Sequence, residues 1–389
     1  MRRLRTLPTR RLWAIVAAVA ALAVMAGIAQ AALSGSAKPA PKALARAIYD
    51  ALRAPHVQGV TAHVHFTNNL LPSGTLPQGA ASPLASGADG RLWITGDGRL
   101  RIELQSDAGD AQIVMNGQRL SVYDASSNTV YRIALPADHR SAKQPEHKPT
   151  LASVKDGLKQ LAQEWNVSGA KPTSTAGRPS YTVRISPKDD GGLLGAAKLA
   201  WDAANGTPLR AAVYAQGQAA PVLELKATDI SYGHVSASDV TLSPPPGAKT
   251  VDVSAPAATG AKGNHKSVAG LKAVRARLSF PLSAPAKLAG LPRREVRLMS
   301  SGKDAGAIVT YGQGLGAILV FQHKADSAQR SPAGRSALRL PQINIRGATG
   351  TELATALGTV VTFDRGGVSY VVAGSVPPAA AENAARGLG

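Results

Sequence analysis

Residues 92–104 read LWITGDGRLRIEL, and this stretch decides the fold class. Apolar side chains occupy every second position on both sides of a Gly-Asp-Gly turn, at Leu92, Ile94, Leu100, Ile102 and Leu104. A period of two is typical of a strand with one buried face, and a short glycine-rich segment between two such runs is typical of a hairpin. The stretch therefore predicts two antiparallel strands that share one apolar face.

The same period continues on both sides of this hairpin. Upstream, apolar side chains alternate with polar ones at Val60, Ala62, Val64 and Phe66. Downstream, apolar runs separated by turn sequences predict strands at 113–115, 120–122, 130–135, 180–185, 197–201, 210–215, 222–230 and 240–242. Strands at such short intervals predict an antiparallel meander. Three prolines at 244–246 are expected to close this domain, because they cannot join the interior of a sheet.

Two segments change to the helical period. Residues 41–53 place apolar side chains on one stripe, with Pro41 suited to the first turn. Residues 151–165 also share an apolar face and follow Thr150, a residue suited to cap a helix. A sheet with one apolar face must bury it against a layer or a ligand, so these helices are expected to cover part of it.

A loop from Thr67 to Gly90 separates the first strand from the hairpin. Prolines and glycines keep it irregular, yet it carries four leucines, Leu70, Leu71, Leu76 and Leu84. Leucines exposed in a loop are costly unless they dock on an apolar surface. Two interpretations stay open: an irregular connection packed on the core, or a flap over an apolar cavity.

The C-terminal part is expected to be a separate small domain. Residues 254–266 are rich in Ala, Gly, Pro and Lys and are interpreted as a linker, and residues 267–389 as a basic α+β domain. Hairpins are predicted at 307–321 and 359–374, a short helix at 351–357, and a closing helix capped by Ser375. From Lys262 onward there are 17 Lys and Arg against 6 Asp and Glu, within a chain of net charge +20, so this part is expected to attract anionic partners.

The N-terminus predicts export. Residues 1–31 combine five arginines, an uncharged apolar run from Leu12 to Ala29, and an Ala-Gln-Ala cleavage site, which is the layout of a signal peptide. An uncleaved membrane anchor is the alternative, because about 20 apolar residues can span a bilayer. Both interpretations place the mature chain outside the cytoplasm, in the cell envelope or secreted, and both argue against a nucleic-acid partner.

No motif in the chain predicts chemistry. Cysteine is absent, which excludes disulfides, thiolate metal sites and cysteine nucleophiles. His63 and His65 share a strand face, but no acidic or histidine cluster completes a metal site, so a solvated face is preferred. The glycines at 312, 314 and 316 precede a strand and therefore form a hairpin turn, not a dinucleotide loop. We predict no enzyme activity, no cofactor and no metal; an unrecognised hydrolase is the least favoured alternative.

At residues 92–124 the chain resembles the LolA-like lipoprotein carriers. The similarity rests on Leu92–Ile94, Arg99–Glu103, Met115–Gly117 and Leu120–Asp124, and continues in order through Trp201–Arg210 and Pro244–Ala248. It implies an incomplete antiparallel β-barrel at 40–253, lidded by helices, whose concave face holds acyl chains. A second domain after such a module resembles the MucB/RseB regulators, which bind a membrane anti-sigma factor. Carriers typically place a basic residue before a proline after the Leu-Trp strand, and Gly96-Asp97 stands there instead.

The leading hypothesis is a non-enzymatic envelope protein that binds a lipid or lipoprotein acyl chain in a half-barrel. The alternative is a MucB/RseB-like regulator that binds a membrane protein; an anionic membrane surface is a further expected partner of the basic domain. The predicted lining consists of the strand residues that share the apolar face: Val60, Val64, Phe66, Leu92, Ile94, Leu100, Ile102, Leu104, Ile113, Leu120 and Val122. The flap would be formed by Leu70, Leu71, Leu76 and Leu84.

Overall fold

The computed structural model describes residues 38–72, 82–117, 119–135, 149–188, 192–253, 268–301, 304–325 and 340–388. The expected export segment at 1–31, the linker at 254–266 and Leu76 of the expected flap lie outside these residues. Within the described part of the chain, no helix is long and apolar enough to cross a membrane.

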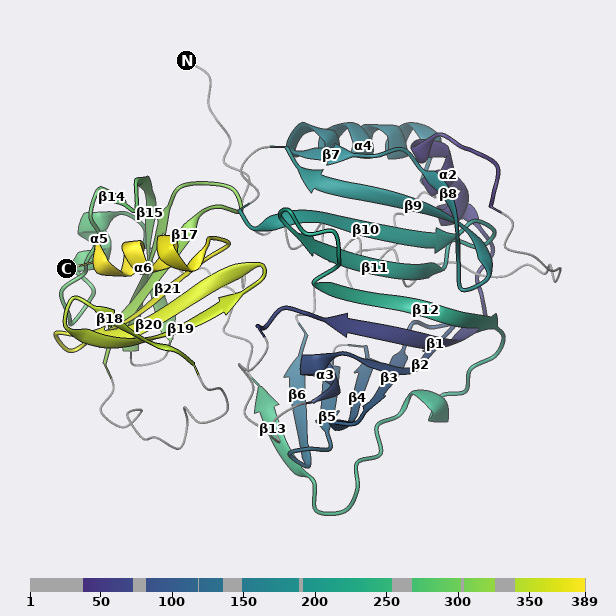
Figure 1. Ribbon diagram of the computed structural model, residues 1–389, viewed down its shortest axis with the longest axis horizontal. Helices are drawn as coiled ribbons and strands as arrows, with labels where there is room; N and C mark the ends of the chain where they lie inside the picture. The colour runs from purple at the N-terminus through teal and green to yellow at the C-terminus, as the bar shows by residue number, and fades with distance from the viewer. Residues whose placement is uncertain are drawn as a thin grey trace.

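The larger of two sheets has 13 strands and is antiparallel except at one edge (Figure 1). Its order is β13-β6-β5-β4-β3-β2-β1-β12-β11-β10-β9-β7, with β8 paired beside β9. The mainly β fold predicted from the alternating pattern is therefore confirmed. The strands are β1 (Gly59–Asn68), β2 (Ala88–Thr95), β3 (Leu100–Ser106), β4 (Gly109–Asn116), β5 (Arg119–Asp124), β6 (Thr129–Ala134), β7 (Trp165–Val167), β8 (Lys171–Thr175), β9 (Arg178–Pro187), β10 (Leu194–Asp202), β11 (Pro208–Ala215), β12 (Leu223–Tyr232) and β13 (Lys249–Val253).

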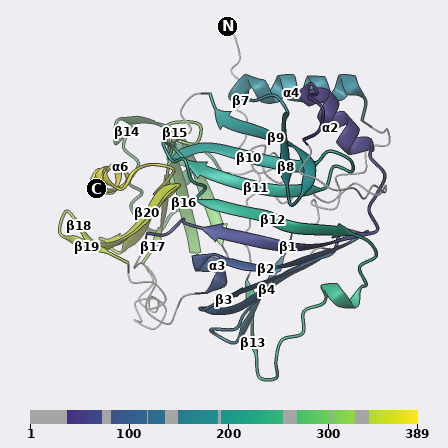
Figure 2. The ribbon, with the colours of Figure 1, turned by 45° about the vertical axis from the view of Figure 1, so that its right-hand side comes forward.

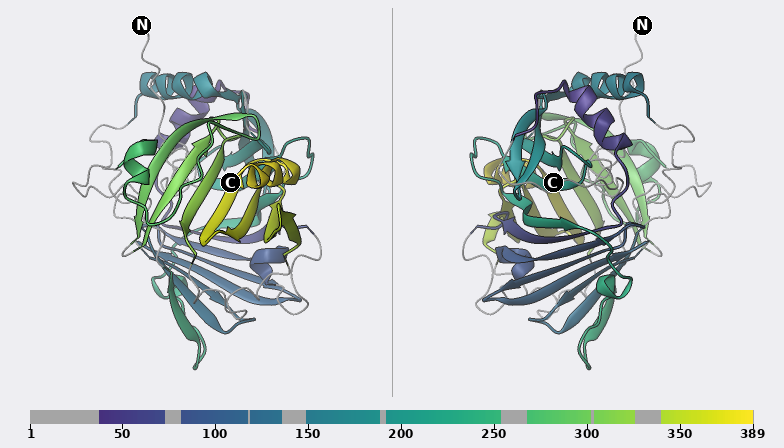
Figure 3. Two further views of the ribbon diagram at one scale, coloured as in Figure 1. Left: turned by 90° about the vertical axis from the view of Figure 1, so that its left-hand side faces the viewer. Right: turned by 90° about the vertical axis from the view of Figure 1, so that its right-hand side faces the viewer.

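Helices α2 (Leu44–Arg53) and α4 (Leu151–Glu164) lie together at one end of this first sheet. Thr150 caps α4: its side chain accepts a hydrogen bond from the amide of Ser153, and the Ser153 side chain accepts one from the amide of Thr150. Both views in Figure 3 show the sheet bending along its length, with these two helices at one end and β13 at the other. The two predicted helices are confirmed, except that α2 begins at Leu44, so Pro41 precedes the helix and does not lie in its first turn.

The second sheet has eight antiparallel strands in the order β14-β15-β16-β17-β21-β20-β19-β18. Helices α5 (Leu271–Arg275) and α6 (Pro378–Arg386) contribute to a single core on one of its faces. The strands are β14 (Lys287–Leu288), β15 (Leu291–Ser301), β16 (Asp304–Tyr311), β17 (Ile318–Lys324), β18 (Gln342–Ile345), β19 (Ala348–Thr355), β20 (Gly358–Arg365) and β21 (Val368–Gly374).

Three local predictions are wrong. Residues 351–357 belong mostly to strand β19, because pairing with β20 overrides the local helical pattern. Residues 240–242 form no strand; Ser238–Val240 is a 3-10 turn, η2. Ser375 does not cap α6, which begins after Pro377; the Ser375 hydroxyl instead donates to the Leu357 carbonyl (2.7 Å).

The two sheets meet at two backbone hydrogen bonds. The Leu193 amide, just before β10, donates to the Ser375 carbonyl (3.1 Å), and the Ala356 amide donates to the Leu70 carbonyl (2.9 Å). Figure 2 shows the second sheet alongside β10 and β11 of the first. Leu70, one of the four leucines of the expected flap, is therefore held at the junction by its backbone.

Candidate ligand-binding face

Strand register brings all eleven predicted lining residues to one face of the first sheet. Val60 pairs with Ile94, Ile94 with Leu100, and Leu100 with Met115, which pairs with Leu120. The neighbouring rows contain the other predicted residues, and no register shift interrupts the pairing from β1 to β6. Because side chains opposite each other across strands share a face, the prediction from alternation places these residues together.

Helix α2 packs on this same face. A cross-strand row runs from Val183 on β9 through Leu199, Ala211 and Leu225 to Phe66 on β1. Val183 and Leu199 pack in one cluster with Ala47 of α2. We therefore call this the inner face, and α2 covers its β9–β10 end.

The apolar inner face extends across eight strands beyond the covered end. One row passes through Val251, Tyr131, Val122, Ile113, Ile102, Leu92, Ala62 and Ile230, from β13 to β12. At the usual spacing of neighbouring strands this row is roughly 34 Å long. Four residues of this row were not predicted to line the site. Ala62, Tyr131 and Ile230 lie in predicted strands, whereas Val251 lies in β13, which follows the three prolines and was not expected.

Burial differs along this face. Val60, Val64 and Leu104 are at most 3 % exposed, whereas the other eight predicted residues are half-buried. Val64 and Leu104 lie where other segments cross the face: Leu84 of α3 (Pro83–Ser86) and Ala176 of the β8–β9 turn pack against the cluster that includes them. Half-burial of long apolar side chains in the middle of a sheet indicates that the described segments cover this face incompletely.

The expected flap leucines are only partly placed. Leu84 packs on the inner face through the short helix α3, which Ser82 caps through a hydrogen bond from the amide of Leu84 (3.3 Å). Leu70 and Leu71 are half-buried after the end of β1.

A buried polar cluster closes the inner face beside Tyr232. The Asp202 side chain is 1 % exposed and accepts hydrogen bonds from Arg178 Nε (3.0 Å) and from the Tyr232 hydroxyl (2.7 Å). Burial and then the charge of Asp202 raise the pKa of Tyr232 well above its usual range. This cluster fastens the β8–β9 hairpin to β10 and β12. Sequence reasoning noted Asp202 only as part of a family motif.

The polar side chains of the turn between β2 and β3 form hydrogen bonds with one another. The Thr95 hydroxyl and then Arg99 donate hydrogen bonds to Asp97 and lower the pKa of its carboxyl to about 2. Asp97, which stands where the carriers typically have a basic residue and a proline, is therefore engaged within its hairpin.

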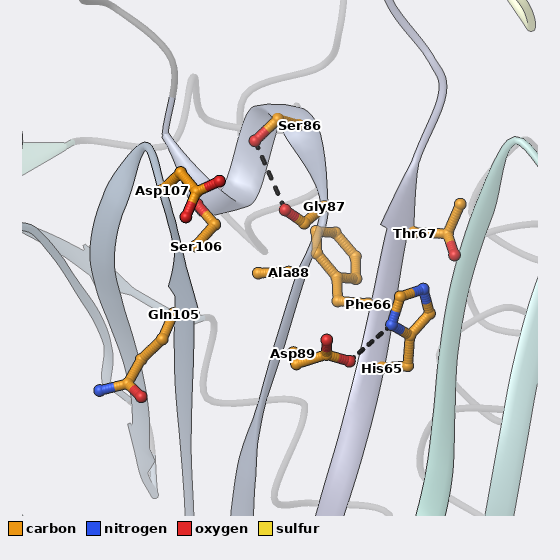
Figure 4. Close-up of a pocket in the computed structure, with 10 residues that line it drawn as sticks. All are labelled: His65, Phe66, Thr67, Ser86, Gly87, Ala88, Asp89, Gln105, Ser106 and Asp107. Carbon is orange, nitrogen blue, oxygen red and sulfur yellow. Dashed lines mark hydrogen bonds and ion pairs between the residues drawn. The ribbon is translucent and has the colours of Figure 1, made fainter.

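A hollow of about 460 Å³ opens at the strand ends next to α3 (Figure 4). Its wall is largely polar, with His65, Asp89, Gln105 and Asp107, and Phe66 is the one predicted lining residue that reaches it. His65 Nδ1 lies 2.7 Å from Asp89 Oδ1, and His63 Nδ1 lies 3.7 Å from Asp229. The two histidines thus each face an aspartate on a neighbouring strand, and the hollow touches the inner face only at its edge, through Phe66 and its strand partner Ala88.

No family model matches the chain, and no curated protein sequence matches it. Among solved structures, MucB in complex with MucA(peri) is similar over 84 % of this chain and 91 % of that chain, with 17 % identity and a TM-score of 0.40. MucB alone is similar over 88 % and 96 %, with 15 % identity and a TM-score of 0.36. A LolA superfamily protein from Nitrosomonas europaea is similar over 52 % and 98 %, with 12 % identity and a TM-score of 0.21. These are the two groups that the sequence motifs resemble, and at such values the function must be argued from this chain's own geometry.

Proposed function

We propose that this chain is a non-enzymatic binding protein of the cell envelope that holds a lipid or lipoprotein acyl chain against the inner face of its first sheet. The observation that carries the proposal is the uninterrupted apolar row across eight strands, most of whose long side chains are half-buried. Contact between such a face and an acyl chain is favourable, because each methylene that is buried contributes about 0.8 kcal/mol to the binding free energy.

Two features of the inner face favour a ligand-binding role over a purely structural one. Among the described residues, the covering segments α2, α3 and the β8–β9 turn leave most long side chains of the row from Val251 to Ile230 half-buried. Apart from Tyr131, the side chains of this row are aliphatic. Binding by shape and hydrophobicity therefore suits the face better than catalysis does.

The test places one charge on either face of a single strand. Ile113→Glu puts a carboxylate on the inner face of β4, and Gln112→Glu, its neighbour, puts the same charge on the opposite face. A photoreactive fatty acid crosslinked to the full-length chain, followed by peptide mapping, should label peptides within 92–122. Labelling should fall at least tenfold in Ile113→Glu and stay unchanged in Gln112→Glu. No label on these peptides, or equal labelling of both variants, would exclude the acyl-chain role.

A second candidate, a regulator that binds a membrane protein, is favoured by the edge strand β13. Its pairing with β6 is parallel, and all five of its residues are exposed, with Val251 and Val253 at 43 % and 38 %. The Lys249 amide donates to the Asn128 carbonyl (2.9 Å), so Thr250 and Asp252 direct their peptide groups to the free side. An extended polypeptide could pair with this edge.

Thr250→Pro distinguishes the two candidates. It removes an amide donor from the free side and leaves the β6 pairing intact, while Thr250→Ala keeps the donor. A regulator should crosslink to one membrane protein, identified by mass spectrometry, from wild-type chain and Thr250→Ala but not from Thr250→Pro. Equal capture by both variants would exclude recognition through this edge.

A further inference from the structure

Among the described residues of the C-terminal part, positive charge gathers at one edge of the second sheet. Six exposed basic side chains belong to α5, β14, β15 and the segment between α5 and β14, which adjoin one another in Figure 1: Lys272, Arg275, Arg277, Lys287, Arg294 and Arg297. We call this set the basic edge. Between residues 268 and 299 Glu295 is the one acidic residue, and it pairs with Arg297.

The packing of this region keeps the six cations on the surface. Val274 of α5 is fully buried in the core, so its helical neighbours at 272 and 275 are turned outward and exposed. Backbone hydrogen bonds from Gly270 to Val296 and from Arg293 to Ala286 hold the flanking segments against β15. The other edge of the same sheet differs: among the described residues of β18, β19 and their turn, Arg346 and Glu352 are the charged ones and balance each other.

We infer that the basic edge docks on an anionic phospholipid surface. Cations spread over a helix, a connecting segment and two strands present no fixed geometry for one carboxylate ligand, whereas mobile anionic headgroups can match such a spread. Three half-buried leucines lie among them in sequence, Leu271, Leu278 and Leu291; they pack against the core of the second sheet and hold the cation-bearing segments in place. This docking goes beyond the proposed ligand role, because it uses the other sheet and does not require a filled inner face.

The absence of cysteine allows a local measurement on the full-length chain. Ala276→Cys, next to α5, and Ala152→Cys, on α4 of the first sheet, each offer one exposed site for an environment-sensitive dye. The probe is a vesicle of phosphatidylcholine with about 30 % phosphatidylglycerol that carries a headgroup quencher, compared with phosphatidylcholine alone. A dye at a defined position reports the docking of that surface, whatever the N-terminal segment does.

Matched charge reversals complete the test. The triple variant Lys272→Glu, Arg277→Glu, Lys287→Glu changes the basic edge, and Arg119→Glu, Lys155→Glu, Lys159→Glu makes the same change of net charge on exposed positions of the first sheet and α4. We expect the dye carried by Ala276→Cys to be quenched on anionic vesicles only. The first triple and raised salt should each weaken this quenching at least tenfold, and the second triple should change it little. The dye carried by Ala152→Cys should not be quenched.

Each contrary result has a definite meaning. Equal quenching on neutral vesicles, or an equal loss in both triple variants, would overturn docking through the basic edge. The dye in Ala276→Cys could instead respond to polyglutamate and not to anionic vesicles. That result would assign the basic edge to an acidic protein partner and would overturn docking on a phospholipid surface as well. The fatty-acid crosslinking test of the inner face is independent of all these outcomes, so the two proposals can fail separately.

Discussion

The two sheets of this protein differ in how completely they are filled. The second, with eight strands, has one continuous core of 22 buried residues that includes α5, α6 and Leu388. In the described part of the first, with 13 strands, the clusters of buried apolar side chains have only five, five and three residues, and further buried side chains such as Val60 and Val114 belong to none of them. The larger sheet thus has the smaller cores. A sheet must bury its apolar face against a layer or a ligand, so the difference is the physical ground for proposing a ligand at the inner face of the first sheet.

The largest expected effect comes from truncating equivalent side chains in the two sheets. Ile318 on β17 is 1 % exposed in the continuous core, and Ile102 on β3 is half-buried on the inner face. Ile318→Ala should destabilise the second sheet by about 2–5 kcal/mol, and Ile102→Ala the first by about 1 kcal/mol, because a cavity forms only where neighbours surround the lost atoms.

Tryptophan fluorescence and hydrogen exchange can measure this difference. The described tryptophans, Trp93, Trp165 and Trp201, all belong to the first sheet, so urea unfolding followed by their emission reports that sheet. Exchange of amides in β16 and β17 reports the second. If the two substitutions lower the free energy of unfolding equally, the inner face of the first sheet is packed as tightly as the core of the second.

An intermediate effect is expected at the junction. Gly192 has a positive φ of 58°, and a Cβ there would lie 2.2 Å from the Ser375 carbonyl oxygen; Gly177 has a φ of 70° with open space around it. Both Gly→Ala substitutions strain the backbone by about 1–2 kcal/mol, but Gly192→Ala also displaces the Leu193–Ser375 hydrogen bond, for about 1 kcal/mol more. Faster exchange of the Leu193 amide in Gly192→Ala alone would confirm that the contact holds the sheets together, and unchanged exchange would contradict it.

The smallest effect is a pH dependence confined to the second sheet. Glu352 on β19 is 8 % exposed, and burial and then Glu382 of α6 raise the pKa of its carboxyl above its usual value. Because the folded pKa is raised, the stabilisation is complete below the unfolded value and is lost as pH rises through the folded value. Glu352→Gln should remove this loss and leave the second sheet slightly more stable at neutral pH. A decline with pH as steep in Glu352→Gln as in the wild type would assign the dependence to another group.

Much of the candidate site was predictable because it depends on a local period. The eleven lining residues were chosen from alternation within single strands, and regular pairing without register shifts carries that alternation across β1 to β5. Residues whose position depends on distant partners were missed. Asp202, Arg178 and Tyr232 meet from three strands, and Ala176 reaches the inner face only because its hairpin folds over.

The wrong secondary-structure predictions also arise from contacts with segments that are distant in the sequence. Residues 351–357 have local helical features, but pairing with β20 makes a strand of most of them. The prolines at 244–246 were expected to close the domain, but β12 already ends at Tyr232 and the chain returns after the prolines as β13, a parallel edge that no local pattern indicates. Strand partners decide such segments, and a sequence read along the chain does not show which strands will be neighbours.

By itself, the sequence determined that the chain is mainly β, which side chains of the meander share a face, and that its C-terminal part is basic, since these follow from periods and composition. Only the tertiary structure decided that the described segments leave this face half-buried, that α2 covers the same side, and that the described cations of the C-terminal part gather at one edge of the second sheet. Exposure depends on what packs against a surface, and those contacts join residues far apart in the chain.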